Sequence, residues 1–293
     1  MKKYLKLIRV KHYIKNGLIF LPLFFSQSFL KFNLLRNVLL SFLSFSFMCS
    51  VVYIINDLND IEKDRKHPIK KKRPLASGEI SKKEAIFIMI VLFVLSILIN
   101  VLISTNNYYS LLLLLGYLVL NILYSCGLKN IVLLDIAILV SGFLIRILYG
   151  SSVADISISN WLYLTVMSMA FYLGLGKRKK ELEKNSDVSR KVLSKYNHEF
   201  LDKNMYLCMT LTIVFYALWT IDPSIATIHS GMVWTVPIVL LICMKYSLDV
   251  EGSSFGDPVD VVTKDKILLS MVFIYILIMT WIFYGSELFK VFC

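Results

Sequence analysis

Nine long apolar stretches constrain the fold of this 293-residue chain more than any other feature of its sequence. A helix that crosses about 30 Å of hydrocarbon needs roughly 20 predominantly apolar residues, and hydrophobic residues make up 57% of this chain. The stretches are residues 16–33, 37–57, 84–104, 107–125, 131–151, 160–177, 205–222, 230–248 and 267–285. The first is short and contains Pro22 and Gln27, and the fifth contains Arg146. We predict an all-α, polytopic membrane helical bundle of nine transmembrane helices, forming a single domain over residues 1–293.

The basic residues are distributed unevenly between the two predicted faces of this bundle. Of the 32 lysines and arginines, 28 lie before the first stretch or near the connections that follow the second, fourth, sixth and eighth. Because cytoplasmic loops carry the excess of positive charge, we expect a multi-pass protein of the cell (inner) membrane with a cytoplasmic N-terminus. Its long cytoplasmic loops would span about residues 58–83 and 178–204. The net charge of +12 then reflects topology and anionic lipids or substrates, and we expect no nucleic-acid partner.

An acidic segment follows the second stretch and reads Asn56-Asp57-Leu58-Asn59-Asp60-Ile61-Glu62-Lys63-Asp64-Arg65. On one continuous helix, Asp57, Asp60 and Asp64 would share a face, with Asn56 at its edge. Mg²⁺ prefers oxygen ligands and is usually shared between a few carboxylates and the phosphates of a substrate. We therefore predict that Asp57, Asp60 and Asp64 are catalytic and bind Mg²⁺ together with Asn56. The alternative is a solvated helix end whose acids pair with neighbouring lysines.

Other polar and cationic residues at the predicted cytoplasmic ends are candidates for binding the anionic groups of a ligand. Arg65 and Arg73 follow the acidic segment, and a guanidinium can bind phosphate oxygens through two hydrogen bonds. The further candidates are Asn56, Lys15, Asn16, Tyr124, Lys129, Asp135, Lys177 and Arg178. Lys15 could instead extend towards lipid headgroups, and Asp135 could simply stabilise the start of its helix.

Arg146 lies inside the fifth stretch, about eleven residues or ~16 Å along the helix from Asp135. A charged side chain at that depth needs a partner or a polar cavity. A structural ion pair and a role in a substrate pocket are both compatible with this position. The active site itself is expected on the cytoplasmic side.

The order of these motifs resembles the UbiA superfamily of intramembrane prenyltransferases. The resemblance rests on N-D-x-x-D-x-x-x-D after the second span and on Tyr124-Ser125 through Lys129 and Leu133-Leu134-Asp135 around the fourth loop. It implies nine helices around a cavity open to the cytoplasm, with prenyl diphosphate bound through Mg²⁺ by two aspartate-rich motifs. This sequence departs from the family at the second motif, where it has Gly174-Leu175-Gly176-Lys177-Arg178-Lys179-Lys180.

One branch of that superfamily, the decaprenyl-phosphate phosphoribosyltransferases, is similar to this chain at four further places. These are Lys15-Asn16, Pro74 to Gly78, Gly142 to Arg146, and Gly176 to Arg178. The similarity implies a Mg²⁺-dependent transfer of 5-phosphoribose from phosphoribosyl diphosphate (PRPP) to a polyprenyl phosphate, with release of diphosphate, in cell-envelope biosynthesis. It implies no oligomeric state.

Two other functions fit parts of the sequence. A UbiA-type prenyltransferase would move a prenyl group from prenyl diphosphate to an aromatic or quinone precursor, and the missing second aspartate motif argues against it. A transporter or ion channel would use the acids as an ion site, but such sites usually lie near the middle of the membrane.

Overall fold

The computed structural model describes residues 2–104, 108–183, 191–226, 231–252 and 257–292, and all the regular elements among them are helices. This result confirms the predicted all-α class. Helices satisfy their backbone polar groups internally, so long apolar segments adopt them in hydrocarbon, where no water can bond to the backbone. The chain divides into two compact units, Met1–Lys129 with Ile145–Ser157, and Asn130–Leu144 with Ile158–Cys293.

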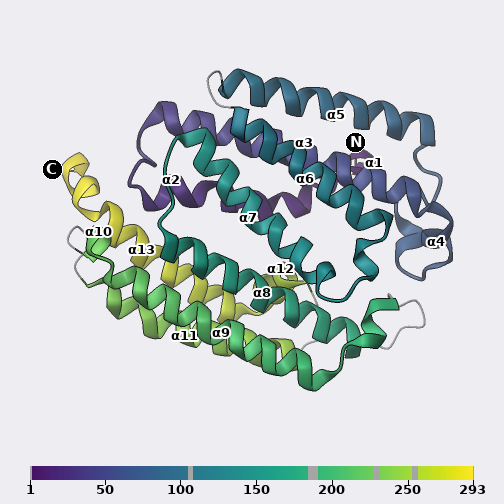
Figure 1. The fold of residues 1–293 in the computed structure, drawn as a ribbon. Coiled ribbons are helices and arrows are strands. Elements are labelled where there is room, and N and C mark those ends of the chain that lie inside the picture. The colour runs from purple at the N-terminus through teal and green to yellow at the C-terminus, as the bar shows by residue number, and fades with distance from the viewer. Residues whose placement is uncertain (1, 105–107, 184–190, 227–230, 253–256, 293) are drawn as a thin grey trace. The chain divides into compact units, whose positions relative to one another are not determined.

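The first unit is organised around one long buried helix, α3. Its elements are α1 (Lys2–Leu7), η1 (Val10–Phe20), α2 (Leu21–Phe25), α3 (Phe32–Asn59), α4 (Ile61–Lys66), η2 (Lys70–Lys72), α5 (Lys82–Ile103), α6 (Tyr108–Cys126), most of η3 (Leu128–Asn130) and the second half of α7 (Leu134–Ala154). Helices α3 and α5 run side by side (Figure 1). The small side chains of Ser44 and Ser96 allow this approach, and each hydroxyl donates to the other residue's carbonyl, at 2.8 and 2.7 Å.

The second unit contains the first half of α7 and the rest of the chain. Its other elements are α8 (Asn160–Glu183), η4 (Lys191–Lys195), α9 (His198–Ile221), α10 (Pro223–Ala226), η5 (Met232–Thr235), α11 (Val236–Gly252), α12 (Pro258–Lys264) and α13 (Lys266–Phe292). Helices α8 and α9 pack against each other over much of their lengths (Figure 1). In the core, the Tyr172 hydroxyl donates to the Cys243 carbonyl at 2.7 Å, which joins α8 to α11.

Seven helices among the described residues are long and apolar enough to cross a membrane. They are Phe32–Asn59, Lys82–Ile103, Tyr108–Cys126, Leu134–Ala154, His198–Ile221, Met232–Gly252 and Lys266–Ser286. Each coincides with one of the nine predicted stretches. The first and sixth stretches differ from the prediction, for two separate reasons.

The first stretch, residues 16–33, is not one helix. A 3₁₀ segment, η1, runs to Phe20, and the short helix α2 begins at Leu21, with Pro22 in its first turn. Proline is suited to a helix start because it has no N–H to donate, and the same property prevents it from continuing the preceding helix. Gln27 then adopts a left-handed backbone conformation, at φ 57°, which ends the helical course before Phe32.

The sixth stretch, residues 160–177, is a continuous helix that extends beyond the predicted end. Helix α8 continues through Lys177, Arg178, Lys179 and Lys180 to Glu183, and it is not among the seven apolar helices. Its apolar part is interrupted by Thr165, and its last turns are charged. The helix therefore has the length of a membrane span with a lower hydropathy.

Gly150 lets η1 approach α7 closely within the first unit. A Cβ atom added at Gly150 would overlap the carbonyl oxygen of Ile19, which belongs to η1. Ile19 is fully buried, so the backbone has no room to retreat without moving the packed core around it. The absence of a side chain at this one position thus fixes where the N-terminal segment lies.

We expect Gly150→Ala to destabilise the protein by about 1–3 kcal/mol, because the new methyl group overpacks a closed interface. Gly116→Ala is the matched control, since a Cβ atom on Gly116 in α6 meets nothing within 4 Å. Alanine favours a helix interior by about 0.5–1 kcal/mol over glycine, so the control is expected to unfold at the same temperature or slightly higher. Thermal unfolding of purified protein in detergent measures both. An unchanged Tm for Gly150→Ala would contradict the close packing.

Candidate active site

The acidic segment is not one continuous helix. Helix α3 ends at Asn59, α4 begins at Ile61, and Asp60 joins them with φ −104° and ψ 13°. Asp57 therefore lies in the last turn of α3 and Asp64 in α4, on either side of this interruption. The expectation of a single helical face that carries all three aspartates does not hold in this geometry.

Asp57 and Asp64 are brought together, whereas Asp60 lies more openly. The first two residues are only 2% and 3% exposed. The Asp60 side chain is 34% exposed and pairs with Lys63 at 3.4 Å. Burying two carboxylates costs free energy unless opposite charges and hydrogen bonds compensate for the lost water. The structure supplies that compensation through two arginines.

Arg73 forms a bridge between the two buried carboxylates. Its Nη1 atom donates to Asp57 Oδ1 at 3.0 Å and to Asp64 Oδ2 at 2.6 Å. The residue follows η2 in an extended conformation, with φ −70° and ψ 144°, as expected for a residue that precedes a proline. After Pro74, the buried side chains of Leu75 and Ile80 hold the loop in place. This packing keeps Arg73 directed at the acids.

Arg9 is a site residue that the sequence did not reveal. Its Nη2 atom donates to Asp57 Oδ1 at 2.5 Å, and its guanidinium lies 4.6 Å from the centre of the Tyr53 ring. Arg9 has a left-handed backbone, φ 54° and ψ 48°, which is uncommon for a residue other than glycine. Its position in an amphipathic N-terminal segment gave no signal that distinguished it from the neighbouring lysines.

Several other predicted residues belong to the first unit, and hydrogen bonds place some of them at the acidic segment or its loop. Ser125, at the end of α6, donates to the Asn56 side-chain oxygen at 2.5 Å, which brings its neighbour Tyr124 to this end of α3. Arg65 pairs with Glu62 at 2.9 Å and donates to the Ala76 carbonyl at 3.3 Å, so it braces the loop. Lys129, in η3, is half-buried.

Asn16 and Arg146 meet in a buried polar cluster of the first unit. Arg146 Nε donates to the Asn16 side-chain oxygen at 2.7 Å, and Asn16 in turn donates to Ser46 at 2.9 Å. The guanidinium also lies 5.0 Å from the Phe45 ring and 5.1 Å from that of Tyr117. Asn16 thus links the N-terminal segment to α3 and α7. Lys15, its neighbour, is partly exposed.

Asp135 and Arg178 form a buried ion pair in the second unit. Arg178 Nε donates to Asp135 Oδ2 at 2.6 Å, and both side chains are 0% exposed. Tyr196 donates to the other oxygen of Asp135 at 2.7 Å. Burial and this hydrogen bond raise the pKa of the Tyr196 hydroxyl to about 12, so it stays protonated throughout the physiological range. We call this group the Asp135–Arg178–Tyr196 clasp; its geometry holds α7, α8 and the segment after η4 together.

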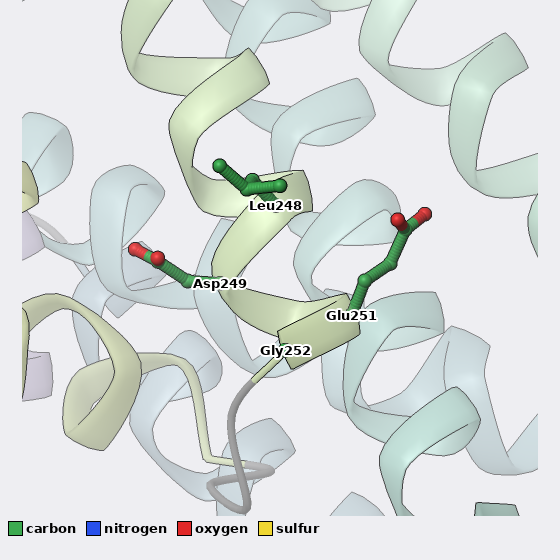
Figure 2. Close-up of a pocket in the computed structure, with 4 residues that line it drawn as sticks. All are labelled: Leu248, Asp249, Glu251 and Gly252. Carbon is green, nitrogen blue, oxygen red and sulfur yellow. The ribbon is translucent and has the colours of Figure 1, made fainter.

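The remaining cations at the end of α8 also lie near acids of the second unit. Lys179 contacts Asp202 at 2.6 Å, and Lys177 lies 3.9 Å from Asp257. A surface pocket at the end of α11 is lined by Leu248, Asp249, Glu251 and Gly252 (Figure 2). Asp249 and Glu251 extend to opposite sides of the helix in this view. Two acids make this pocket unsuited to an anionic ligand.

The donor set around Arg73 fits a divalent cation that is shared with a substrate. No group of three or more His, Cys, Asp or Glu residues in the described part of the chain forms a metal site by itself. Mg²⁺, however, typically takes one or two carboxylates and completes its six ligands with water and phosphate oxygens. Asp57 and Asp64 already converge on one positively charged group, and Asn56 is an oxygen donor one residue away.

Comparison with known proteins decides the family. Residues 18–254 match the model of the UbiA prenyltransferase family. The chain belongs to this family. A decaprenyl-phosphate phosphoribosyltransferase from Mycolicibacterium smegmatis is 31% identical over 296 residues, which cover 95% of this chain and 89% of the relative. A protein of the same name from Corynebacterium glutamicum is 30% identical over 95% of this chain and 84% of its own length.

Solved structures share the UbiA fold. A UbiA homolog from Archaeoglobus fulgidus bound to GPP and Mg²⁺ superposes with a TM-score of 0.69, at 21% identity, over 96% of this chain and 98% of the homolog. A structure of a digeranylgeranylglyceryl phosphate synthase superposes with a TM-score of 0.63, at 22% identity, over 94% and 96%. At these identities the likeness concerns the fold.

The Asp135–Arg178–Tyr196 clasp predicts a stability effect. Asp135→Asn removes one of the two carboxylates that pair with the fully buried Arg178, while Glu181 keeps its contact at 2.5 Å, and we expect a loss of about 1.5–3 kcal/mol. The double variant Asp135→Asn/Arg178→Gln removes both charges and is expected to recover part of that loss. Thermal unfolding in detergent measures both variants.

Glu199→Gln is the control for this experiment, because the Glu199–Lys203 pair is 74% exposed on both sides and is expected to leave Tm unchanged. If Asp135→Asn unfolds at the same temperature as Glu199→Gln, the clasp does not stabilise the fold.

Proposed function

We propose that this protein is a polyprenyl-phosphate phosphoribosyltransferase, which moves 5-phosphoribose from PRPP to a polyprenyl phosphate and releases diphosphate. The observation that carries the proposal is the similarity to curated decaprenyl-phosphate phosphoribosyltransferases over 90–95% of the chain, at 30–31% identity. The geometry adds two buried carboxylates beside two arginines, a combination suited to a metal-bound diphosphate. The family match crosses both compact units, which supports a single functional domain.

We propose that Asp57, Asp60 and Asp64, with Asn56, bind Mg²⁺ together with the diphosphate of PRPP. When bound, the ion would neutralise negative charge on the leaving diphosphate. Asp57 and Asp64 are buried near the ends of α3 and α4, and the surrounding packing holds their side chains in place. Asp60 is exposed enough to accept a ligand without rearrangement of the core. The three aspartates are accordingly assigned as the catalytic residues.

The attacking group in this reaction is a phosphate monoester oxygen of the lipid acceptor. It is already anionic at neutral pH, so the chain need not supply a strong general base. The task of the protein is to hold several negative groups in place while positive charge develops at C1 of the ribose. Arg9 and Arg73 lie nearest to the acids, and we assign both to phosphate binding.

The other predicted substrate-binding residues divide into direct and supporting roles. Lys15, Tyr124, Lys129 and Lys177 are partly exposed and are proposed to contact substrate. Arg65, Asn16 and Arg146 are proposed to support the site in the first unit by holding its loop and helix ends, and Asp135 and Arg178 are proposed to hold helix ends of the second unit. A buried residue in such a role acts through position, because its polar atoms are already hydrogen-bonded.

We further propose nine membrane crossings in the cell (inner) membrane, with η1–α2 and α8 as the first and sixth. The N-terminus and the acidic segment would face the cytoplasm, and the cavity would open to that side, in agreement with the distribution of basic residues. Phe87, Leu102 and Trp281 are among the large apolar side chains that are more than half exposed, as expected for helices in contact with lipid.

The proposed reaction predicts a labelled lipid. Membranes that contain this protein, supplied with PRPP labelled in the ribose, Mg²⁺ and polyprenyl phosphate, are expected to form an organic-extractable product that EDTA prevents. Chromatography of the lipid fraction measures it, with membranes lacking the protein as control. Absence of this product, together with transfer from a prenyl diphosphate to an aromatic acid, would replace the proposal with the prenyltransferase function.

The metal assignment predicts the effect of three substitutions. Asp57→Ala, Asp60→Ala and Asp64→Ala are each expected to lower Mg²⁺-dependent turnover about 100-fold or more, because each removes a proposed ligand of the Mg²⁺ that would stabilise the leaving diphosphate. Glu199→Gln, which changes an acid that is 74% exposed and lies outside the acidic segment, is expected to retain turnover within about twofold. Initial rates at saturating PRPP measure these effects. If Asp60→Ala keeps full activity, Asp60 does not belong to the ligand set.

A further inference from the structure

Arg73 occupies the position from which a metal ion would use both buried carboxylates. One nitrogen, Nη1, contacts Asp57 Oδ1 and Asp64 Oδ2 at 3.0 and 2.6 Å. Asp57 Oδ1 also accepts a hydrogen bond from Arg9. Guanidinium groups thus neutralise both carboxylates and donate hydrogen bonds to them.

A divalent cation that binds the same oxygens has to compete with Arg73. Metal ligation uses the lone pairs of the carboxylate oxygens, and Nη1 already points its protons at one oxygen of each residue. Two positive groups held a few ångströms apart in a poorly solvated place also repel each other strongly. A bound metal ion therefore disfavours the contact of Arg73 with both acids, and that contact disfavours metal binding.

Arg73 can leave the carboxylates without disrupting the core. Its side chain is 29% exposed, and the preceding η2 segment contains no buried residue. The loop that follows is anchored separately by Leu75 and Ile80, both less than 4% exposed. The guanidinium can therefore move by rotation of its side chain while the loop stays in place. Once released, its planar donors match the oxygens of a phosphate.

We propose that Arg73 is a positioning residue that couples metal binding to diphosphate binding. While Arg73 bridges Asp57 and Asp64, it weakens the binding of a divalent cation in the absence of diphosphate. When a diphosphate binds together with the cation, Arg73 transfers from the carboxylates to phosphate oxygens, so the two ligands strengthen each other's binding. The inference rests on the proposed function only in assuming that the site binds a metal-bound diphosphate. The coupling is reciprocal: the cation raises the affinity for diphosphate by the same factor as diphosphate raises the affinity for the cation.

Equilibrium binding of Mn²⁺, followed by electron paramagnetic resonance, tests this coupling on the purified full-length chain. The wild type, Arg73→Gln and Arg73→Lys are titrated with Mn²⁺ alone and with Mn²⁺ plus inorganic diphosphate. Lys203→Gln is the control for the loss of one positive charge, since Lys203 is 74% exposed and pairs with Glu199. Thermal unfolding of each variant verifies that it is folded.

Arg73→Gln is expected to bind Mn²⁺ alone about tenfold more tightly than the wild type. Diphosphate is expected to raise Mn²⁺ affinity about tenfold in the wild type and less than threefold in Arg73→Gln, within the usual range of coupling between sites. Arg73→Lys keeps the charge without the planar fork and is expected to fall between them. Lys203→Gln is expected to behave as the wild type.

Two results would overturn the proposal: a folded Arg73→Gln that binds Mn²⁺ no more tightly than the wild type, or an effect of diphosphate that is the same in both. If Arg73→Gln does not fold, Arg73→Lys decides the question by the same two comparisons. Neither PRPP nor a lipid is present, so a failure of the labelled-lipid assay leaves this result intact. Conversely, ribosyl transfer with uncoupled Mn²⁺ binding would overturn only the role of Arg73.

Discussion

The burial of two carboxylates where α3 gives way to α4 is the constraint on which the candidate site depends. Asp57 and Asp64 have lost most of their water, and such charges persist only if neighbouring cations compensate for it. Arg9 and Arg73 do so from opposite sides in sequence, since Arg9 precedes η1 and Arg73 lies in the loop after α4. The requirement for neutralisation thus assembles the N-terminus, two helix ends and a loop around one pair of acids.

The same rule explains the other buried charges. Arg146 is hydrogen-bonded to Asn16 and lies against aromatic rings in the first unit, and Arg178 is paired with Asp135 in the second. Each adds a polar contact between helices to their apolar packing, which by itself discriminates weakly between neighbours in lipid. These contacts are consistent with the supporting role that we propose for Asn16, Arg146, Asp135 and Arg178.

The cationic end of α8 separates this protein from the standard two-motif members that its sequence resembles. Its lysines and arginine approach acids of the second unit, at distances from 2.6 Å for Arg178–Asp135 and Lys179–Asp202 to 3.9 Å for Lys177–Asp257. In the first unit, Asp57 and Asp64 converge on Arg73, and the proposed Mg²⁺ site uses these acids. The proposed function accordingly takes one metal-bound diphosphate at these acids, with the other phosphates bound by cations.

The sequence alone determined the all-α class, seven of the nine apolar helices, the acidic segment and the family, because hydropathy and short motifs depend on neighbouring residues. Only the tertiary structure revealed the interruption at Asp60, the contact of Arg9 with Asp57 and the pairing of Arg178 with Asp135. Arg9 lies 48 residues from Asp57, and Arg178 lies 43 from Asp135, so no local pattern links them. Which cation neutralises which acid is decided by how the helices pack, since a buried charge takes the partner that the fold brings within reach.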